Sequence, residues 1–321
     1  MRVGLDVSPL DQTRAGTARY LEQLRSVEGV ELVPLAFHGR GRAATVARDA
    51  FWYPFALSRL SRRSAVDVLH CPTFRGPLSS AVPLVVTVHD LAVLRHPETF
   101  NLWTRRYSRH CVPRVVRTAR RVIAVSGFTK RELVELLGTP EEKIRVVPNG
   151  VADVFDPAGP AAEGDYVLAV GTLEPRKNLA RARDAARLAG VELRVVGERG
   201  WGGVDVDGWA GRVSDEELAA LYRGARCLVY PSLYEGFGLP VIEAMACGTP
   251  VVTSAGGATE EVAGGAALLV DPLDVDSIAA GIGEADQRRE ELVRLGLERT
   301  RAFGWAEVAR ATAEVYREAL G

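Results

Sequence analysis

Short apolar runs recur along this chain at intervals that leave room for about one helix between neighbours. In the first half these runs predict strands at Val3–Val7, Leu32–Phe37, Val66–His70, Leu84–Val88, Val122–Val125 and Ile144–Val147. In the second half they predict strands at Tyr166–Val170, Leu193–Val196, Cys227–Tyr230, Val251–Thr253 and Ala267–Val270. Strands that alternate with helices form parallel sheets covered by helices on both faces. The pattern therefore predicts an α/β protein with two such series.

Helical periodicity and turn residues divide the chain further. Helices are predicted at Thr129–Leu137, Asp215–Arg223 and Asp276–Glu284, and a last amphipathic helix at Trp305–Leu320. The Pro-, Gly- and Ala-rich stretch Asp156–Gly164 is predicted to be a linker. We expect one doubly wound domain over residues 1–155, a second over 165–304, and a terminal helix over 305–321.

Composition excludes several classes of protein. The chain is 47% hydrophobic and 25% charged, which is typical of a soluble globular protein. No apolar run approaches the roughly 20 residues of a membrane span. The N-terminus leads directly into a strand, which is unlike a secretory signal. The four cysteines are scattered without a C-x-x-C pair, so we expect reduced thiols and a cytoplasmic location.

The charge is distributed unevenly. Residues 1–150 hold 23 Lys and Arg against 13 Asp and Glu, and residues 151–321 hold the remaining 17 and 28. Nearly all of the basic residues are arginines. A basic first half predicts an anionic partner on that side.

The most informative stretch runs from Tyr230 to Pro250 and is predicted to form a strand, a glycine-rich turn and a short helix. Gly236 and Gly238 allow the backbone to approach a ligand closely. Glu235 falls in the turn, and Glu243 falls about one turn into the helix. The N–H groups at a helix N-terminus favour an anion. Donors for a diphosphate and carboxylate acceptors for hydroxyls together suit a sugar nucleotide.

Two adjacent cations follow another strand. Arg176 and Lys177 lie in the stretch Gly171–Asn178, where a loop leads into a helix. A guanidinium fork beside a compact ammonium suits a diphosphate, although basic pairs are also common in solvated loops.

These motifs resemble the donor-binding signature of the retaining glycosyltransferases of family 4, and the resemblance covers nearly the whole chain. It implies the GT-B fold, with two Rossmann-like doubly wound domains facing across a cleft and the last helix packing back on the first domain. It implies that Glu243 holds the ribose, that Glu235 holds the donor sugar, and that Arg176 and Lys177 bind the phosphates. It also implies that backbone groups of Gly236, Phe237, Gly238 and Leu239 contact the sugar and phosphates.

The resemblance extends to motifs outside that stretch. The loop from Arg14 to Tyr20 matches the family's N-terminal glycine loop, although Ala15 precedes Gly16 where many members have a second glycine. His89, after a first-domain strand, matches the histidine that lies close to the reacting sugar. A satisfied core histidine is the alternative. Arg212 and Val213 match the loop that holds the nucleobase.

Several polar motifs have structural explanations. Ser126 or Thr129, in the family-like run Ser126–Lys130, is predicted to cap a helix rather than bind a ligand. Ser214 with Glu217 predicts a capping box.

No metal site is expected. Two D-x-D patterns, Asp205–Asp207 and Asp274–Asp276, lack the strand context of a metal site. The pairs His70–Cys71 and His110–Cys111 fit no zinc spacing, so we expect buried thiols there instead.

Two first-half segments pair aromatic residues with arginines, Phe51–Arg63 and Trp103–Arg121. Three interpretations remain open: peripheral contact with the anionic inner face of a membrane, a core with a solvated basic face, and a site for an acceptor phosphate.

The sequence therefore predicts a retaining, metal-independent hexosyltransferase that uses no cofactor. Its donor would be GDP- or UDP-linked, with GDP-mannose favoured, and its acceptor a hydroxyl of a glycan, a lipid-linked sugar or a small molecule. A non-catalytic sugar-nucleotide binder is one alternative. An NAD-dependent oxidoreductase is another, although no G-x-G-x-x-G is present. No motif supports nucleic-acid binding.

Overall fold

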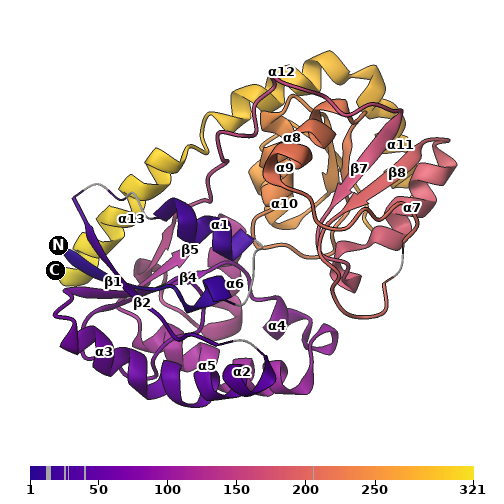
Figure 1. Cartoon of the computed structure of the whole chain (residues 1–321). Helices are drawn as coiled ribbons and strands as arrows, with labels where there is room; N and C mark the ends of the chain where they lie inside the picture. The colour runs from indigo at the N-terminus through magenta and orange to yellow at the C-terminus, as the bar shows by residue number, and fades with distance from the viewer. Residues whose placement is uncertain (12–15, 25–26, 28, 40, 205) are drawn as a thin grey trace. The chain divides into compact units, whose positions relative to one another are not determined.

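The chain folds into two compact units. A computed structural model describes residues 1–11, 16–24, 27, 29–39, 41–204 and 206–321. Unit 1 comprises Met1–Asn149 with Trp305–Gly321, and unit 2 comprises Gly150–Gly304 (Figure 1). Within the described residues, no helix has the length and apolar character needed to cross a membrane.

Unit 1 is built on a six-stranded parallel sheet with the order β2-β1-β3-β4-β5-β6. Its strands are β1 (Arg2–Asp6), β2 (Glu31–Leu35), β3 (Val68–Cys71), β4 (Leu84–Val88), β5 (Arg121–Ala124) and β6 (Ile144–Val146). Because all pairs are parallel, the carboxyl ends of these strands lie at one edge of the sheet. Ligands of doubly wound sheets bind at that edge.

Helices cover both faces of this sheet. They are α1 (Gly16–Gln23), α2 (Arg42–Ala47), the π-helix η3 (Arg48–Ala56), α3 (Leu57–Arg63), α4 (Ala92–Arg95), α5 (Leu102–Thr118) and α6 (Gly127–Leu137). Short 3-10 turns lie at Ser8–Asp11, Pro97–Thr99 and Glu141–Lys143. Residues of η3, α3, α5 and α6 share one buried core with the sheet.

The terminal helix α13 (Trp305–Leu320) packs on the opposite face of the same sheet. Its Val308 and Val315 join the core formed by Val3 and Val68. The Tyr316 hydroxyl lies 2.8 Å from His70 Nδ1, within hydrogen-bond distance. Figure 1 shows both chain termini at this side of unit 1. The predicted return of the last helix to the first domain is thus confirmed.

Unit 2 is built on a five-stranded parallel sheet with the order β11-β10-β9-β7-β8. Its strands are β7 (Tyr166–Val170), β8 (Glu192–Val196), β9 (Leu228–Tyr230), β10 (Val251–Ser254) and β11 (Leu268–Val270). Its helices are α7 (Leu179–Leu188), α8 (Asp215–Gly224), α9 (Leu239–Ala246), α10 (Gly257–Ala263), α11 (Val275–Gln287) and α12 (Arg289–Thr300), with a 3-10 turn at Pro175–Lys177.

The expected α/β architecture is confirmed, and the structure adds two details. The stretch Asp156–Gly164, expected to be a linker, lies inside unit 2, because the Arg223 side chain donates to the carbonyl oxygens of Asp156 and Pro160. The buried thiol is found at Cys71, whereas Cys111 is only half-buried on α5.

Candidate functional site

The turn after β9 brings a carboxylate to the start of a helix. α9 begins at Leu239 with Pro240 in its first turn, as the sequence predicts. Gly238 precedes it with a φ of 106°, a left-handed conformation that favours glycine. A Cβ atom at Gly238 would also lie 3.0 Å from Thr259 Cγ2. The Phe237 ring packs edge-on against Phe303, at 5.8 Å between centroids. The glycine therefore allows the tight entry into α9 that leaves Glu235 in the turn.

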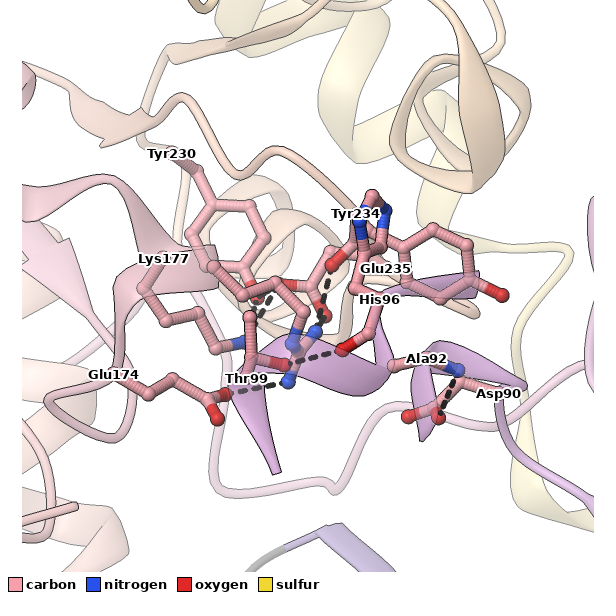
Figure 2. Close-up of polar contacts among 10 residues, drawn as sticks. Asp90, Ala92, His96, Thr99, Glu174, Lys177, Tyr230, Tyr234 and Glu235 are labelled. Atoms are coloured by element: carbon pink, nitrogen blue, oxygen red, sulfur yellow. Dashed lines mark hydrogen bonds and ion pairs between the residues drawn. The ribbon is translucent and has the colours of Figure 1, made fainter. Parts of the chain in front are cut away.

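Two cations and a phenol converge on Glu235 (Figure 2). Glu235 Oε1 accepts from Lys177 Nζ at 2.6 Å and from the Tyr230 hydroxyl at 2.8 Å. Glu235 Oε2 accepts from Arg176 Nη1 at 2.9 Å. Charge-assisted hydrogen bonds of this length are among the strong ones in proteins. The structure thus brings together the three charged residues that the sequence assigned to the sugar and the phosphates.

The electrostatics of this cluster keep the carboxylate ionised. Burial by itself raises the pKa of Glu235, but Lys177 and Arg176 outweigh it and hold the pKa at about 2. Burial lowers the pKa of Lys177, an effect that the adjacent Glu235 opposes. Glu235 is therefore a permanent acceptor at neutral pH, with two cations and one phenol donating to it.

Glu174 is a member of this site to which the sequence analysis gave no role. Its Oε1 accepts from Arg176 Nη2 at 2.5 Å, and its side chain is buried (Figure 2). Arg176 Nη1 also donates to the Tyr234 carbonyl oxygen at 2.7 Å. The guanidinium is thus oriented from two sides. The only signal in the sequence was an acidic residue two positions before the cation, which is too common to single out.

Backbone geometry holds the cation loop against the turn after β9. The Leu233 N–H donates to the Arg176 carbonyl oxygen at 2.9 Å. The Asn178 amide donates to the carbonyl oxygens of Pro231 and Pro272. Asn178 adopts a left-handed conformation, with φ 57°, which asparagine tolerates better than most residues. Gly171, with φ 154°, lies against the Lys177 stem and leaves room for it.

Glu243 occupies a different environment from Glu235. It lies about one turn into α9, is buried, and accepts from the Tyr222 hydroxyl of α8 at 3.1 Å through Oε2. The two carboxylates thus belong to one strand-turn-helix unit, as expected, but they have different protein partners. Tyr222 is a second residue that the sequence alone did not indicate.

The remaining donor-side candidates lie before α8. Arg212 Nη1 contacts Glu198 Oε1 at 2.9 Å, and Val213 is half-buried. The next residue, Ser214, caps α8 in a complete capping box with Glu217, which confirms that prediction.

In unit 1, His89 lies immediately after β4 at the carboxyl edge of the sheet. Its Nε2 lies 3.0 Å from the Pro72 carbonyl oxygen, and its ring meets Tyr20 edge-on at 5.0 Å. A carbonyl oxygen only accepts, so Nε2 carries the proton. Burial lowers the pKa of His89, which favours the neutral ring with a lone pair at Nδ1. Asp90 Oδ1 accepts from the Ala92 N–H at 3.0 Å (Figure 2).

Other unit 1 predictions have mixed outcomes. Gly16 opens α1, while Arg14 and Ala15 of the same loop lie outside the described residues. Ser126 caps α6 by accepting from the Thr129 N–H, which confirms the predicted cap.

The D-x-D patterns also have structural explanations. Asp274 caps α11, and Asp207 pairs with Arg187 at the surface, while Asp205 lies outside the described residues. The part of the chain that the structure describes holds no group of three or more His, Cys, Asp or Glu side chains arranged to hold a metal.

Comparison with known proteins places this geometry in a family. Residues 153–298 match the family model described as "Glycosyl transferases group 1", and residues 12–154 match "Glycosyltransferase Family 4". The O-antigen chain mannosyltransferase B of Escherichia coli is 34% identical over 94% of this chain and 88% of its own length.

Two further proteins extend the comparison. The MMP alpha-(1->4)-mannosyltransferase of Mycolicibacterium hassiacum is 33% identical over 81% of this chain and 72% of its own length. The sucrose-phosphate synthase of Thermosynechococcus elongatus has the same fold, with a TM-score of 0.76 and 20% identity over 99% of this chain and 98% of that one. The chain therefore belongs to the GT-B glycosyltransferases of family 4.

Proposed function

We propose that the protein is a retaining, metal-independent transferase that moves a sugar from a nucleoside diphosphate to an acceptor hydroxyl. The observation that carries this proposal is the convergence of Arg176, Lys177 and Tyr230 on Glu235 beside the N-terminus of α9. An ionised carboxylate binds sugar hydroxyls, while the two cations and the positive N-terminal end of the α9 dipole bind phosphates.

Each donor group would have a separate contact. Glu243 would bind the ribose by sharing its carboxylate with the Tyr222 hydroxyl. The backbone around Arg212 and Val213 would hold the nucleobase, and Gly16 would let the first loop approach the phosphates. These roles need no metal, because cations and helix N–H groups already offset the diphosphate charge.

The chemical step would break the bond between the sugar C1 and the diphosphate oxygen. The acceptor oxygen would bond to C1 from the same face, and the departing phosphate oxygen would take the acceptor proton. Arg176 and Lys177 would stabilise the charge on the leaving group. His89, neutral with a lone pair at Nδ1, would accept a hydrogen bond from a sugar hydroxyl and position it.

The related proteins support the choice of mannose as the transferred sugar. Two of the relatives that cover most of this chain are described as mannosyltransferases, one of them acting in the O-antigen chain. We therefore propose GDP-mannose as the donor and a glycan, lipid-linked or free, as the acceptor.

Thermal melting with GDP, UDP and NAD, each with and without EDTA, tests this proposal. A ligand present at 100 times its dissociation constant adds about 2.7 kcal/mol of stability. We expect GDP to raise the melting temperature and EDTA to leave that shift unchanged. A shift with UDP alone would change the donor but keep the transferase. A shift with NAD alone, or one that EDTA abolishes, would overturn the assignment.

We also propose that unit 1 touches an anionic membrane surface through η3 and the start of α5. Phe51, Phe55 and Leu102 are 68%, 60% and 72% exposed, and Trp103 Nε1 donates to Asp49 Oδ2 at 3.0 Å, which joins the two segments. No acidic residue lies between Glu98 and Glu132, whereas α5 exposes a row of arginines (Arg105, Arg106, Arg109, Arg114 and Arg117). Exposed aromatic residues beside cations suit an anionic lipid interface.

A further inference from the structure

Tyr230 is a buried titratable residue that has no part in the chemical step proposed above. It ends β9 and is 3% exposed. Its hydroxyl donates to Glu235 Oε1 at 2.8 Å and accepts from Lys177 Nζ at 2.8 Å. Because Lys177 Nζ also donates to Glu235 Oε1 at 2.6 Å, the three groups close a ring of hydrogen bonds (Figure 2). An ammonium cannot accept, so the phenol proton lies toward the carboxylate and a lone pair toward the ammonium.

Of the three groups, the phenol has the least freedom to move. β9 is an inner strand of the unit 2 sheet, between β10 and β7. The Tyr230 carbonyl oxygen accepts from the Thr253 hydroxyl of β10 at 2.9 Å. Lys177, by contrast, has a flexible four-carbon stem and ends a 3-10 turn, and Glu235 lies in the turn after β9. A rigid ring on an inner strand therefore sets the place of two side chains that come from loops.

The ammonium of Lys177 needs its acceptors. Burial lowers the pKa of Lys177, and the neighbouring Arg176 adds to that effect. The carboxylates of Glu235 and Glu174 oppose it. The Tyr230 ring contributes as well, since Lys177 Nζ lies 5.2 Å from its centroid. A lysine that binds a phosphate must keep its proton, so each acceptor at this ammonium matters.

One N–H of the ammonium remains available to a ligand. An ammonium has three donors, and Lys177 uses one toward Glu235 and one toward Tyr230. The third has no acceptor among the residues that the structure describes. A buried donor that the protein leaves unpaired suits a phosphate oxygen. By occupying one of the three directions, the Tyr230 oxygen also determines where the remaining N–H points.

We propose that Tyr230 is a positioning residue for sugar transfer, whose hydroxyl holds the Lys177 ammonium in place for the donor diphosphate. The proposal rests on the transferase function proposed above and gives a role to a residue that would itself touch neither sugar nor phosphate. When a sugar hydroxyl takes up part of the hydrogen-bonding capacity of Glu235, the Tyr230 oxygen remains as an acceptor for Lys177. The ammonium thus keeps its place as the donor binds.

The first test is Tyr230→Phe, which removes the hydroxyl and keeps the ring beneath the ammonium. The chain has three lysines, Lys130, Lys143 and Lys177, so NMR of lysine labelled with ¹³C at Cε follows each ammonium through a pH titration. Lys177→Arg identifies the Lys177 resonance by removing it. In Tyr230→Phe we expect Lys177 to lose its proton at lower pH, at a proton concentration about tenfold higher, because one hydrogen bond to a charged group is lost. Lys130 and Lys143 should titrate as in the wild type.

The rate of transfer should show the same change. The alkaline limb of kcat/KM against pH reports groups of the free enzyme. Burial, followed by the charge of Glu235, raises the pKa of Tyr230 well above its ordinary value, so the limb belongs to Lys177 and not to the phenol. We expect Tyr230→Phe to move the limb to lower pH and to reduce kcat/KM about tenfold on its alkaline side. A tyrosine with a purely structural role would reduce the rate equally at every pH and leave the limb in place.

Tyr166→Phe is the matched control. Tyr166 is a buried tyrosine at the amino end of the neighbouring strand β7, at the edge of the sheet opposite to the donor site. Its hydroxyl donates to the Leu221 carbonyl oxygen at 2.8 Å, and the Arg194 guanidinium lies over its ring at 3.9 Å. The control thus also removes one buried hydroxyl beside a cation. It should lower the melting temperature and change neither the Lys177 titration nor the alkaline limb.

The role of Tyr230 is overturned if Lys177 titrates at the same pH in Tyr230→Phe as in the wild type, or if Tyr166→Phe moves the titration equally. The NMR titration needs no donor, so its result is independent of the GDP and UDP melting shifts. A nucleotide shift with an unmoved Lys177 titration would reject Tyr230 alone and keep the donor site. A moved titration in a protein that binds neither nucleotide would reject the donor assignment and, with it, any role of Tyr230 in transfer.

Discussion

At the residue scale, the proposed donor site depends on one carboxylate that accepts hydrogen bonds from three side chains. Glu235 stays ionised in a buried position because Lys177, Arg176 and Tyr230 together offset the loss of water. The ordering of Arg176 depends in turn on Glu174. Such a cluster is assembled before a ligand arrives, so little reorganisation accompanies binding.

Lys177→Ala, which removes the ammonium group, should reduce the rate of sugar transfer about 100-fold or more. The variant loses a cation that would bind a donor phosphate and stabilise the negative charge on the leaving group. Stability should fall by only about 2 kcal/mol, since Glu235 keeps Arg176 and Tyr230. Steady-state kinetics and denaturant unfolding measure the two effects. The control is Lys130→Ala, which removes a surface ion pair with Glu141 and should change neither the transfer rate nor the stability by much. Full activity in Lys177→Ala would contradict the site.

For Glu243, the informative change is Glu243→Gln, which keeps an oxygen for the Tyr222 hydroxyl. We expect the Michaelis constant for the donor to rise about tenfold while the melting temperature changes little. An unchanged donor affinity would leave Glu243 as a buried partner of Tyr222 and no more.

The ionisation of Glu235 also predicts how stability depends on pH. Its pKa falls from 4.5 to about 2 on folding, which corresponds to about 3 kcal/mol. A carboxyl group whose pKa is lower in the folded state stabilises the fold at pH values above its unfolded-state pKa. This stabilisation is lost as the pH falls through the folded-state pKa. The stability gap between the wild type and Glu235→Gln should therefore be constant from pH 7 to about 5, and narrow between about 4.5 and 2. A gap that does not vary with pH would show that the ionised form is not favoured on folding.

At the element scale, η3 and α5 combine functions that the sequence could not separate. Their inward residues, including Trp52, Tyr53 and Val112, belong to the core of unit 1. Their outward residues include exposed Phe51, Phe55 and Leu102. The core and membrane interpretations of these two segments are therefore compatible, since a core side and an exposed side coexist on the same helices and α5 adds exposed arginines.

The membrane proposal predicts that Phe51→Ser with Phe55→Ser weakens binding to vesicles that contain phosphatidylglycerol. A buried phenylalanine contributes about 2 kcal/mol, so the double change should reduce partitioning at least tenfold. Co-sedimentation measures the bound fraction. Leu188→Ser with Leu273→Ser removes equally exposed apolar groups from unit 2 and is the control. Equal binding to vesicles of phosphatidylcholine alone, or no loss in the phenylalanine variant, would contradict the proposal.

At the scale of the whole molecule, α13 covers the sheet face of unit 1 that α5 and η3 leave free, and it arrives from the far end of the chain. The hydrogen bonds of His70 to Tyr316 and Thr87 join β3, β4 and α13 in the core. Burial lowers the pKa of His70 to about 3, so this histidine is neutral and its two nitrogens serve one donor and one acceptor.

Tyr316→Ala should therefore destabilise unit 1 by about 3 to 4 kcal/mol, because it leaves a cavity and an unpaired imidazole nitrogen. Unit 2 contains Glu235, Arg176, Lys177 and Glu243 of the proposed donor site and does not include Tyr316. Denaturant unfolding followed by tryptophan fluorescence measures the loss, and calorimetry with GDP measures donor binding, which should persist. Loss of both together would show that the units do not fold independently.

Local patterns were sufficient for the strands, the caps and the donor motif. β4 and β7 begin and end where the apolar runs predict, because burial on both faces demands an uninterrupted apolar strand. The helix α13 has the bounds that its amphipathic pattern predicts. Ser126 and Ser214 were identified as caps because a cap is a contact between residues three apart. The sequence alone therefore determined the order of elements and the identity of Glu235, Arg176 and Lys177 as a set.

Only the tertiary structure decided which partners those residues have. Glu174, Tyr222 and Tyr230 look like ordinary core or loop residues in the sequence. What distinguishes them is their contacts, which either join distant positions in the sequence or depend on the direction in which the side chain points. The buried contact between Asp49 and Arg75 has the same character, because these residues come from two segments that meet only when unit 1 folds. Periodicity and capping motifs involve residues within about one helical turn of each other. The partners that form hydrogen bonds with a buried charge can come from any part of the fold.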